Sequence, residues 1–211
     1  MKRVWAIMAV TGLVAAAAPA AEITVTVTGQ VSFNGIGDEP LNGVGGGDNV
    51  ELSFTVDSNN FVEGVPGDTR GYEINQASFS LTFDTPLSIG LLDPFPAGQT
   101  PYFGLVDGFP VSDGFFVSTS PVSPGGVPLE QTPFNLNLDL GYTGDTLASL
   151  DILDALGTYD FTGLTRFGFN LWAVFPDNVA MDVDFAQMTI VPEPATIGLL
   201  LVPLLFMRRR G

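Results

Sequence analysis

The stretch Phe134-Asn135-Leu136-Asn137-Leu138-Asp139-Leu140 alternates between apolar and polar side chains without a break. Successive side chains of a β-strand point to opposite faces, so this pattern predicts a strand with one buried and one solvent-facing side. The same period of two runs through most of residues 22–190, in Ile23–Phe33, Val50–Val56, Ser78–Phe83, Phe167–Phe175 and Met181–Phe185. So many half-buried strands predict an all-β fold, and we expect an antiparallel β-sandwich of two packed sheets, similar to a jelly roll.

Long loops rich in proline and glycine are expected between these strands. Residues 85–133 hold nine of the 16 prolines, so we expect short strands there, such as Phe115–Ser118, separated by loops. Asn34–Asn49, which contains three consecutive glycines, is a second expected loop. Thr146–Leu156 lacks clean alternation and lies between a potential N-cap and a glycine, so a short helix and a loop are both open there.

The last predicted strand contains a change of face. Its apolar residues share one parity over Met181–Phe185, but Met188 and Ile190 have the opposite parity. An offset of one residue moves side chains to the other face of a strand, so the pattern indicates a bulge or a change of sheet. We favour a bulge near Phe185-Ala186.

The composition excludes several classes of function. The 211 residues contain no histidine and no cysteine, which removes the base of Ser-His and Cys-His catalysis, the thiolate nucleophile and the commonest zinc ligands. Seven basic residues stand against 23 acidic ones, and between the two termini only Arg70 and Arg166 are cationic. Such a surface repels phosphates, so we expect no nucleic-acid partner. We also expect no cofactor and no enzymatic activity.

Two acidic features have both a functional and a structural interpretation. Asp182 and Asp184 share one strand face about 7 Å apart, which suits a glycosidase acid pair but arises on any acidic strand face. Asp48 follows a glycine-rich run that resembles one copy of a calcium-binding nonapeptide repeat, with Asp38 and Glu39 nearby. Such repeats bind calcium as stacked copies, so we favour a solvated turn, with Asp48 as the calcium candidate.

Trp172 shares the parity of Arg166 and Asn170, opposite to that of Phe167 and Leu171. An exposed indole beside polar groups on a sheet face can serve as a platform on which sugars stack. Burial on both faces of a central strand would instead make Trp172 a packing residue. Both interpretations stay open, and Trp172 is the candidate ligand-stacking residue.

The N-terminal residues have the order of a secretory signal peptide. Met1-Lys2-Arg3 is basic, an apolar run then reaches Ala18, and small residues occupy Ala18 and Ala20. We therefore expect cleavage after Ala20 or one residue later, which assigns residues 1–20 to the signal peptide and 21–190 to the β-domain. A retained membrane anchor is the alternative, but the run is short for a span and rich in alanine.

The C-terminus combines a proline-rich motif, an apolar stretch and a basic end. Pro192-Glu193-Pro194 predicts an extended, accessible break, because proline fits neither a central strand nor a helix interior. The apolar residues Ala195–Met207 would span only ~20 Å as a single-pass helix, against a hydrocarbon core of ~30 Å, and Pro203 interrupts them. We expect a temporary anchor, with Arg208-Arg209-Arg210 on the cytoplasmic side.

In this order, Pro192, Glu193 and Pro194, the apolar stretch and the arginines resemble the PEP-CTERM sorting signal of Gram-negative bacteria. In that family an integral-membrane transpeptidase, exosortase, recognises the Pro-Glu-Pro motif and processes the protein. The resemblance covers residues 191–211, about a tenth of the chain, and says little about the β-domain. It implies exosortase as a partner, transient insertion into the inner membrane, and delivery to the cell surface or extracellular matrix. An ordinary single-pass tail anchor is the alternative.

We therefore expect an exported, non-catalytic surface or matrix protein. The alternative is a carbohydrate-binding module on the same export route, in which Trp172 and the proline-rich loops form a groove for extracellular polysaccharide.

Overall fold

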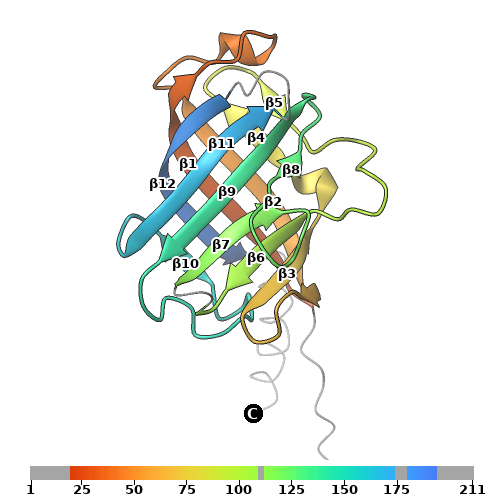
Figure 1. Cartoon of the computed structure of the whole chain (residues 1–211), viewed down its shortest axis with the longest axis vertical. Helices are drawn as coiled ribbons and strands as arrows, with labels where there is room; N and C mark the ends of the chain where they lie inside the picture. The colour runs from red at the N-terminus through yellow and green to blue at the C-terminus, as the bar shows by residue number, and fades with distance from the viewer. Residues whose placement is uncertain (1–19, 109–111, 174–179, 194–211) are drawn as a thin grey trace, which may run out of the picture.

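The computed structural model of the chain describes residues 20–108, 112–173 and 180–193. Eight antiparallel strands form one sheet that curves round and closes into a barrel (Figure 1). In spatial order they are β1 (Glu22–Asn34), β12 (Ala180–Pro192), β11 (Leu164–Ala173), β9 (Phe134–Tyr142), β7 (Asp113–Ser118), β6 (Tyr102–Val106), β3 (Thr69–Ile74) and β2 (Asn49–Glu63). The circle closes where β2 pairs with β1 between Glu22 and Gln30.

Smaller elements flank the barrel. Two short strands continue the sheet outward from β2, and one short strand each pairs with β9 and β12. They are β4 (Ser80–Phe83), β5 (Ser88–Ile89), β8 (Val127–Pro128) and β10 (Gly157–Tyr159), accompanied by the 3₁₀ turns η1 (Leu41–Gly43) and η2 (Gln76–Ser78). The expectation of short strands separated by loops in residues 85–133 is confirmed by β5 to β8.

The all-β antiparallel class is confirmed, but in place of the expected two-sheet jelly roll the structure has one closed sheet. The deciding element is β1, because it pairs with a neighbour along both of its edges. Val25 lies opposite Ile190 of β12 on one side and opposite Phe54 of β2 on the other. Alternation buries one face of each strand in a sandwich and in a barrel alike, so the sequence pattern does not distinguish the two.

The barrel interior is filled by the apolar half of the alternating pattern. Leu136, Leu138 and Leu140 are fully buried, and Phe134 is nearly so. Aromatic rings from several strands pack against one another inside, with ring centroids 5.5 Å apart for Phe54–Phe103 and 5.8 Å apart for Phe103–Phe115. An eight-stranded barrel of this kind is narrow enough for side chains to fill its interior.

The predicted change of face in the last strand is a bulge, as expected. Thr28 of β1 lies opposite Gln187 and Gly29 lies opposite Phe185, so Ala186 is the extra residue of β12. Both sets of apolar residues therefore face the interior, because the bulge absorbs the offset. Met188 and Ile190 are fully buried together with Phe185.

The segment Thr146–Leu156, for which a helix and a loop were both open, is an irregular loop. It lies against one end of the barrel, where Leu147, Leu150 and Ile152 join the hydrophobic core. The Tyr72 hydroxyl fixes the loop, because it donates to the Leu150 carbonyl at 2.8 Å and accepts from the Ile152 amide at 3.0 Å.

The first and last described strands place the two ends of the chain side by side. Ile23 lies opposite Pro192, and the Glu193 amide donates to the Glu22 carbonyl at 2.9 Å. The predicted signal-peptide run, the apolar helix over Ala195–Met207 and the terminal arginines lie outside the described residues. Within residues 20–108, 112–173 and 180–193, no helix has the length and apolar character needed to cross a membrane.

Candidate functional site

The first half of the Pro-Glu-Pro motif is paired to the barrel. Pro192 is the last residue of β12 and lies opposite Ile23 of β1, so the strand runs up to the motif and ends at its first proline. The Thr24 hydroxyl also donates to Oε1 of Glu193. Pro194 and Arg208–Arg210 lie outside the described residues.

Proline is tolerated at this position because its missing N–H faces away from the partner strand. The Glu193 amide points to β1, so the backbone nitrogen of Pro192, one residue earlier, points the other way. On that side, β12 is paired with the short strand β10 only as far as Ile190, which lies opposite Gly157. Pro192 therefore removes no hydrogen bond from the ladder.

The second candidate region is the outer face of β9 and β11. Trp172 lies on the outer surface with Arg166 and Asn170, as its parity predicts, and is 36% exposed. It stands opposite Asn135 of β9, and Asn170 stands opposite Asn137. The indole is therefore not a core residue, and three carboxamides surround it on the same face.

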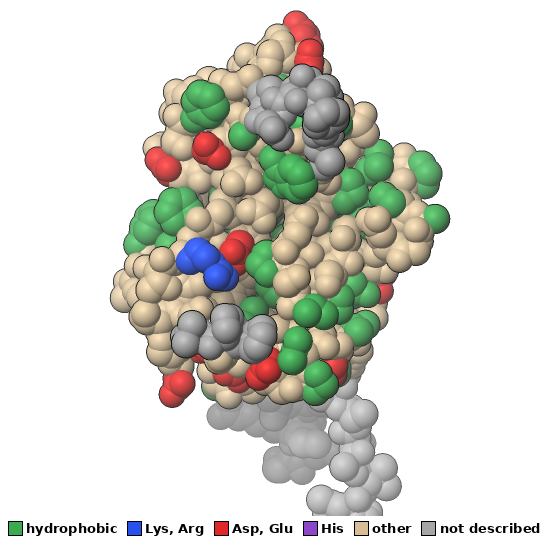
Figure 2. All heavy atoms as spheres, viewed as in Figure 1, with side chains coloured by type: hydrophobic (Ala, Val, Ile, Leu, Met, Phe, Trp, Pro, Cys, Tyr) green, Lys and Arg blue, Asp and Glu red, His purple; other side chains and the backbone are tan. Residues whose placement is uncertain are grey.

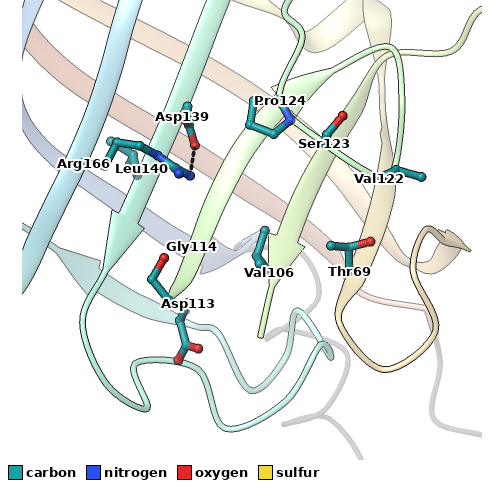
Figure 3. A pocket seen from close by; sticks show the side chains of 11 residues that line it. Thr69, Val106, Asp113, Gly114, Val122, Ser123, Pro124, Asp139, Leu140 and Arg166 are labelled. Atoms are coloured by element: carbon teal, nitrogen blue, oxygen red, sulfur yellow. Dashed lines mark hydrogen bonds and ion pairs between the residues drawn. The ribbon is translucent and has the colours of Figure 1, made fainter. Parts of the chain in front are cut away.

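A cavity of about 180 Å³ lies farther along the same outer face (Figure 3). Arg166 reaches across from β11 to Asp139 of β9, with Nη2 2.9 Å from Oδ1. Ser123 and Pro124 line the cavity on the side away from Arg166 (Figure 3). Figure 2 shows a basic group next to an acidic one near the middle of this face, with further acidic side chains toward the edges of the view.

Asp113 also lines this cavity, but its carboxylate serves the fold. Its side chain points away from the cavity toward the loops at the end of the barrel (Figure 3). Oδ1 accepts from the Gly108 amide at 2.9 Å and Oδ2 accepts from the Leu147 amide at 2.7 Å. Burial, together with the carboxylates of Asp113, Asp145 and Asp68, raises the pKa of nearby Asp107.

The loop over residues 119–126 forms one side of this region. It is held by backbone bonds between Thr119 and Gly126 and between Gly126 and Val117, both 3.2 Å. Beneath it lies the ring of Phe116, which points outward from β7 and yet is fully buried. The ring crosses Gly104 of β6, where a Cβ atom would overlap it.

The remaining acidic candidates do not form a site in the described part of the chain. Asp48 accepts from the Gly45 amide at 2.8 Å and closes the glycine-rich turn. Asp182 and Asp184 are exposed on the outer face of β12. Among the described residues, no group of three or more acidic side chains is arranged to hold a metal ion.

Comparisons of the chain with protein-family models, with curated proteins and with solved structures found no match. The function of the two candidate regions therefore has to be inferred from their geometry. Sequence reasoning found Trp172 and the motif but missed the cavity beside Arg166 and Asp139. The adjacent pair Phe115-Phe116 was the available signal, because a strand with apolar side chains on both faces must be covered outside as well as inside.

Proposed function

We propose that this chain is an exported surface or matrix protein whose residues 191–211 are a sorting signal processed by an exosortase, and whose barrel acts without catalysis. The observation that carries the proposal is the ordered C-terminal series of Pro-Glu-Pro, apolar stretch and arginines, paired with an export signal at the other end.

The position of the two ends supports the proposal. Glu22 and Glu193 are hydrogen-bonded neighbours, so both membrane-directed segments leave from one end of the barrel. A domain held in this way stands on the membrane by that end, and its outer wall faces the surroundings. The apolar stretch is too short and too interrupted for a durable span, which suits an intermediate that is later cut.

Glu193→Gln is the sharpest test of whether exosortase recognises the motif, because it changes the motif without disturbing the fold. Glutamine keeps an oxygen acceptor for Thr24 and leaves the backbone bond to Glu22 in place, while the carboxylate charge is lost. We expect cells expressing this variant, or the variant with Pro192, Glu193 and Pro194 all replaced by Ala, to retain uncut protein in the inner membrane. Mass spectrometry of the mature C-terminus, after cell fractionation, gives the readout.

Thr24→Val is the matched control. It removes the side-chain contact with Glu193 but leaves the motif intact, so the protein should be cut and released as in the wild type. Normal release of the triple-alanine variant would falsify the sorting proposal.

A further inference from the structure

The outer face of β9 and β11 carries hydrogen-bonding groups that the fold does not use. Asn135, Asn137 and Asn170 are half-buried, and within the described residues their carboxamides form no hydrogen bond with another part of the chain. Each carboxamide offers two donors and one acceptor in a plane. The amide side chains of Asn34 and Asn49, by comparison, are bonded within the fold, whereas that of Gln187 forms no hydrogen bond within the described residues.

These amides lie in a row between an aromatic ring and an ion pair. Trp172 marks one end, next to Asn135, and Arg166 with Asp139 marks the other. Trp172 and Arg166 are six positions apart along β11, which is roughly 20 Å along the strand. The row is therefore long enough for several consecutive units of an extended polymer.

The loop over residues 119–126 gives the row a side wall. Near one end, a Cβ atom at Gly126 would lie 3.5 Å from Nε1 of Trp172. At the other end, Val122, Ser123 and Pro124 line the cavity beside Arg166 (Figure 3). The wall is fixed to the barrel, because Pro121 rests on Gly71 and Gly126 is bonded to Val117. We call this row of polar side chains beside the wall, together with the cavity at its Arg166 end, the outer groove.

We propose that the outer groove binds a neutral, hydroxyl-rich polysaccharide chain lying along β9 and β11. The flat indole of Trp172 receives the apolar face of one sugar ring, and the carboxamides exchange hydrogen bonds with hydroxyl groups of the next units. The Arg166–Asp139 pair supplies a donor and an acceptor at the far end.

The negative charge of the protein favours a neutral polysaccharide over an anionic one. The net charge is −16, and the two described cations are each paired with a carboxylate, Arg70 with Glu63 and Arg166 with Asp139. On the neighbouring strand β12, Asp182 lies opposite Asn170. A polyanion such as alginate would meet repulsion here, whereas hydroxyl groups carry no charge.

Binding is tested with the full chain in mild detergent, so that the outcome does not depend on export or processing. The probes are neutral β-glucans and mannan on one side and alginate on the other. Trp5→Phe leaves Trp172 as the single tryptophan, so its fluorescence reports on the groove. We expect a neutral polysaccharide to bind and to shift the Trp172 emission, and alginate to do neither.

Two variants on the same strand test the location. Trp172→Ala should weaken binding by roughly tenfold or more, since it removes the aromatic platform. Phe167→Ala, which removes an exposed ring of opposite parity, should bind as the unmodified chain does. Thermal unfolding of both variants checks that the barrel is intact.

Four results would overturn the proposal. The first three are an absence of binding to every neutral polysaccharide, equal binding by the Trp172→Ala and Phe167→Ala variants, and alginate bound as tightly as a neutral chain. The fourth is a dimer in sedimentation that buries Trp172, since a second copy would then occupy the groove.

Discussion

At the scale of single residues, the outer wall of the barrel depends on the contact between Gly104 and Phe116. The ring of Phe116 crosses the backbone of Gly104 and fills the space that any side chain there would need. We predict that Gly104→Ala lowers the free energy of unfolding by about 1–3 kcal/mol, because the ring must leave its position or the strands must separate. Urea unfolding measures the effect.

The control for this substitution is Gly37→Ala. No atom lies within 4 Å of a Cβ built at Gly37, so its free energy of unfolding should stay near that of the wild type. In a Phe116→Leu background the cost of Gly104→Ala should shrink, because the two positions are coupled through the ring. Equal costs for Gly104→Ala and Gly37→Ala would contradict the packing described above.

At the scale of elements, the bulge in β12 keeps its two halves facing the same interior. Removing Ala186 would leave Phe185 followed by Gln187 and Met188, which restores unbroken alternation with the same residues inside. We predict that the deletion variant still unfolds cooperatively and loses about 1–3 kcal/mol, because the bulge adds local twist and curvature. Thermal unfolding followed by circular dichroism provides the measurement.

Deleting Thr26 from β1 is the contrasting case. This strand is paired on both edges and has no bulge between Ile23 and Val27, so the loss turns Ile23 and Val25 to the outside. The cooperative transition should disappear. A Thr26 deletion as stable as the Ala186 deletion would mean that register is not set by the buried face.

The same strands show how far the sequence can predict this fold. Alternation locates β1, β2, β9, β11 and β12, and the change of parity locates the bulge, because both follow from the period of side chains along one strand. Closure depends on which strand edges meet, and no periodicity records the pairing of β1 with β2. The cavity beside Arg166 escapes prediction for the same reason, since it is built by a loop that folds back over a neighbouring strand.

At the scale of the whole molecule, buried phenols limit stability in alkali. Burial raises the pKa of Tyr142 to about 12 and also raises the pKa of Tyr72 and of Tyr159. In the unfolded chain these groups ionise near pH 10, so between about pH 10 and 12 the unfolded chain releases protons that the folded chain retains. Stability is therefore undiminished below about pH 10 and should fall as the pH rises through this window.

Thermal midpoints across this pH range, followed together with phenolate absorbance, check the prediction. Ionisation of the three tyrosines should coincide with unfolding. Tyr142→Phe should make the decline shallower, because one raised pKa is removed. Full ionisation of all three groups in a chain that is still folded would contradict the burial of their hydroxyls.

The side-by-side arrangement of Glu22 and Glu193 also decides how the barrel bears tension. A pull that enters at Glu193 while a polymer is held on β9 and β11 is directed along β12. The ladder between β12 and β1, from Ile23–Pro192 to Asn34–Met181, is then loaded in shear and its bonds share the force. A pull applied between the two chain ends would open the same bonds one after another. We therefore expect the barrel to resist a pull along β12 better than a pull that draws its two ends apart.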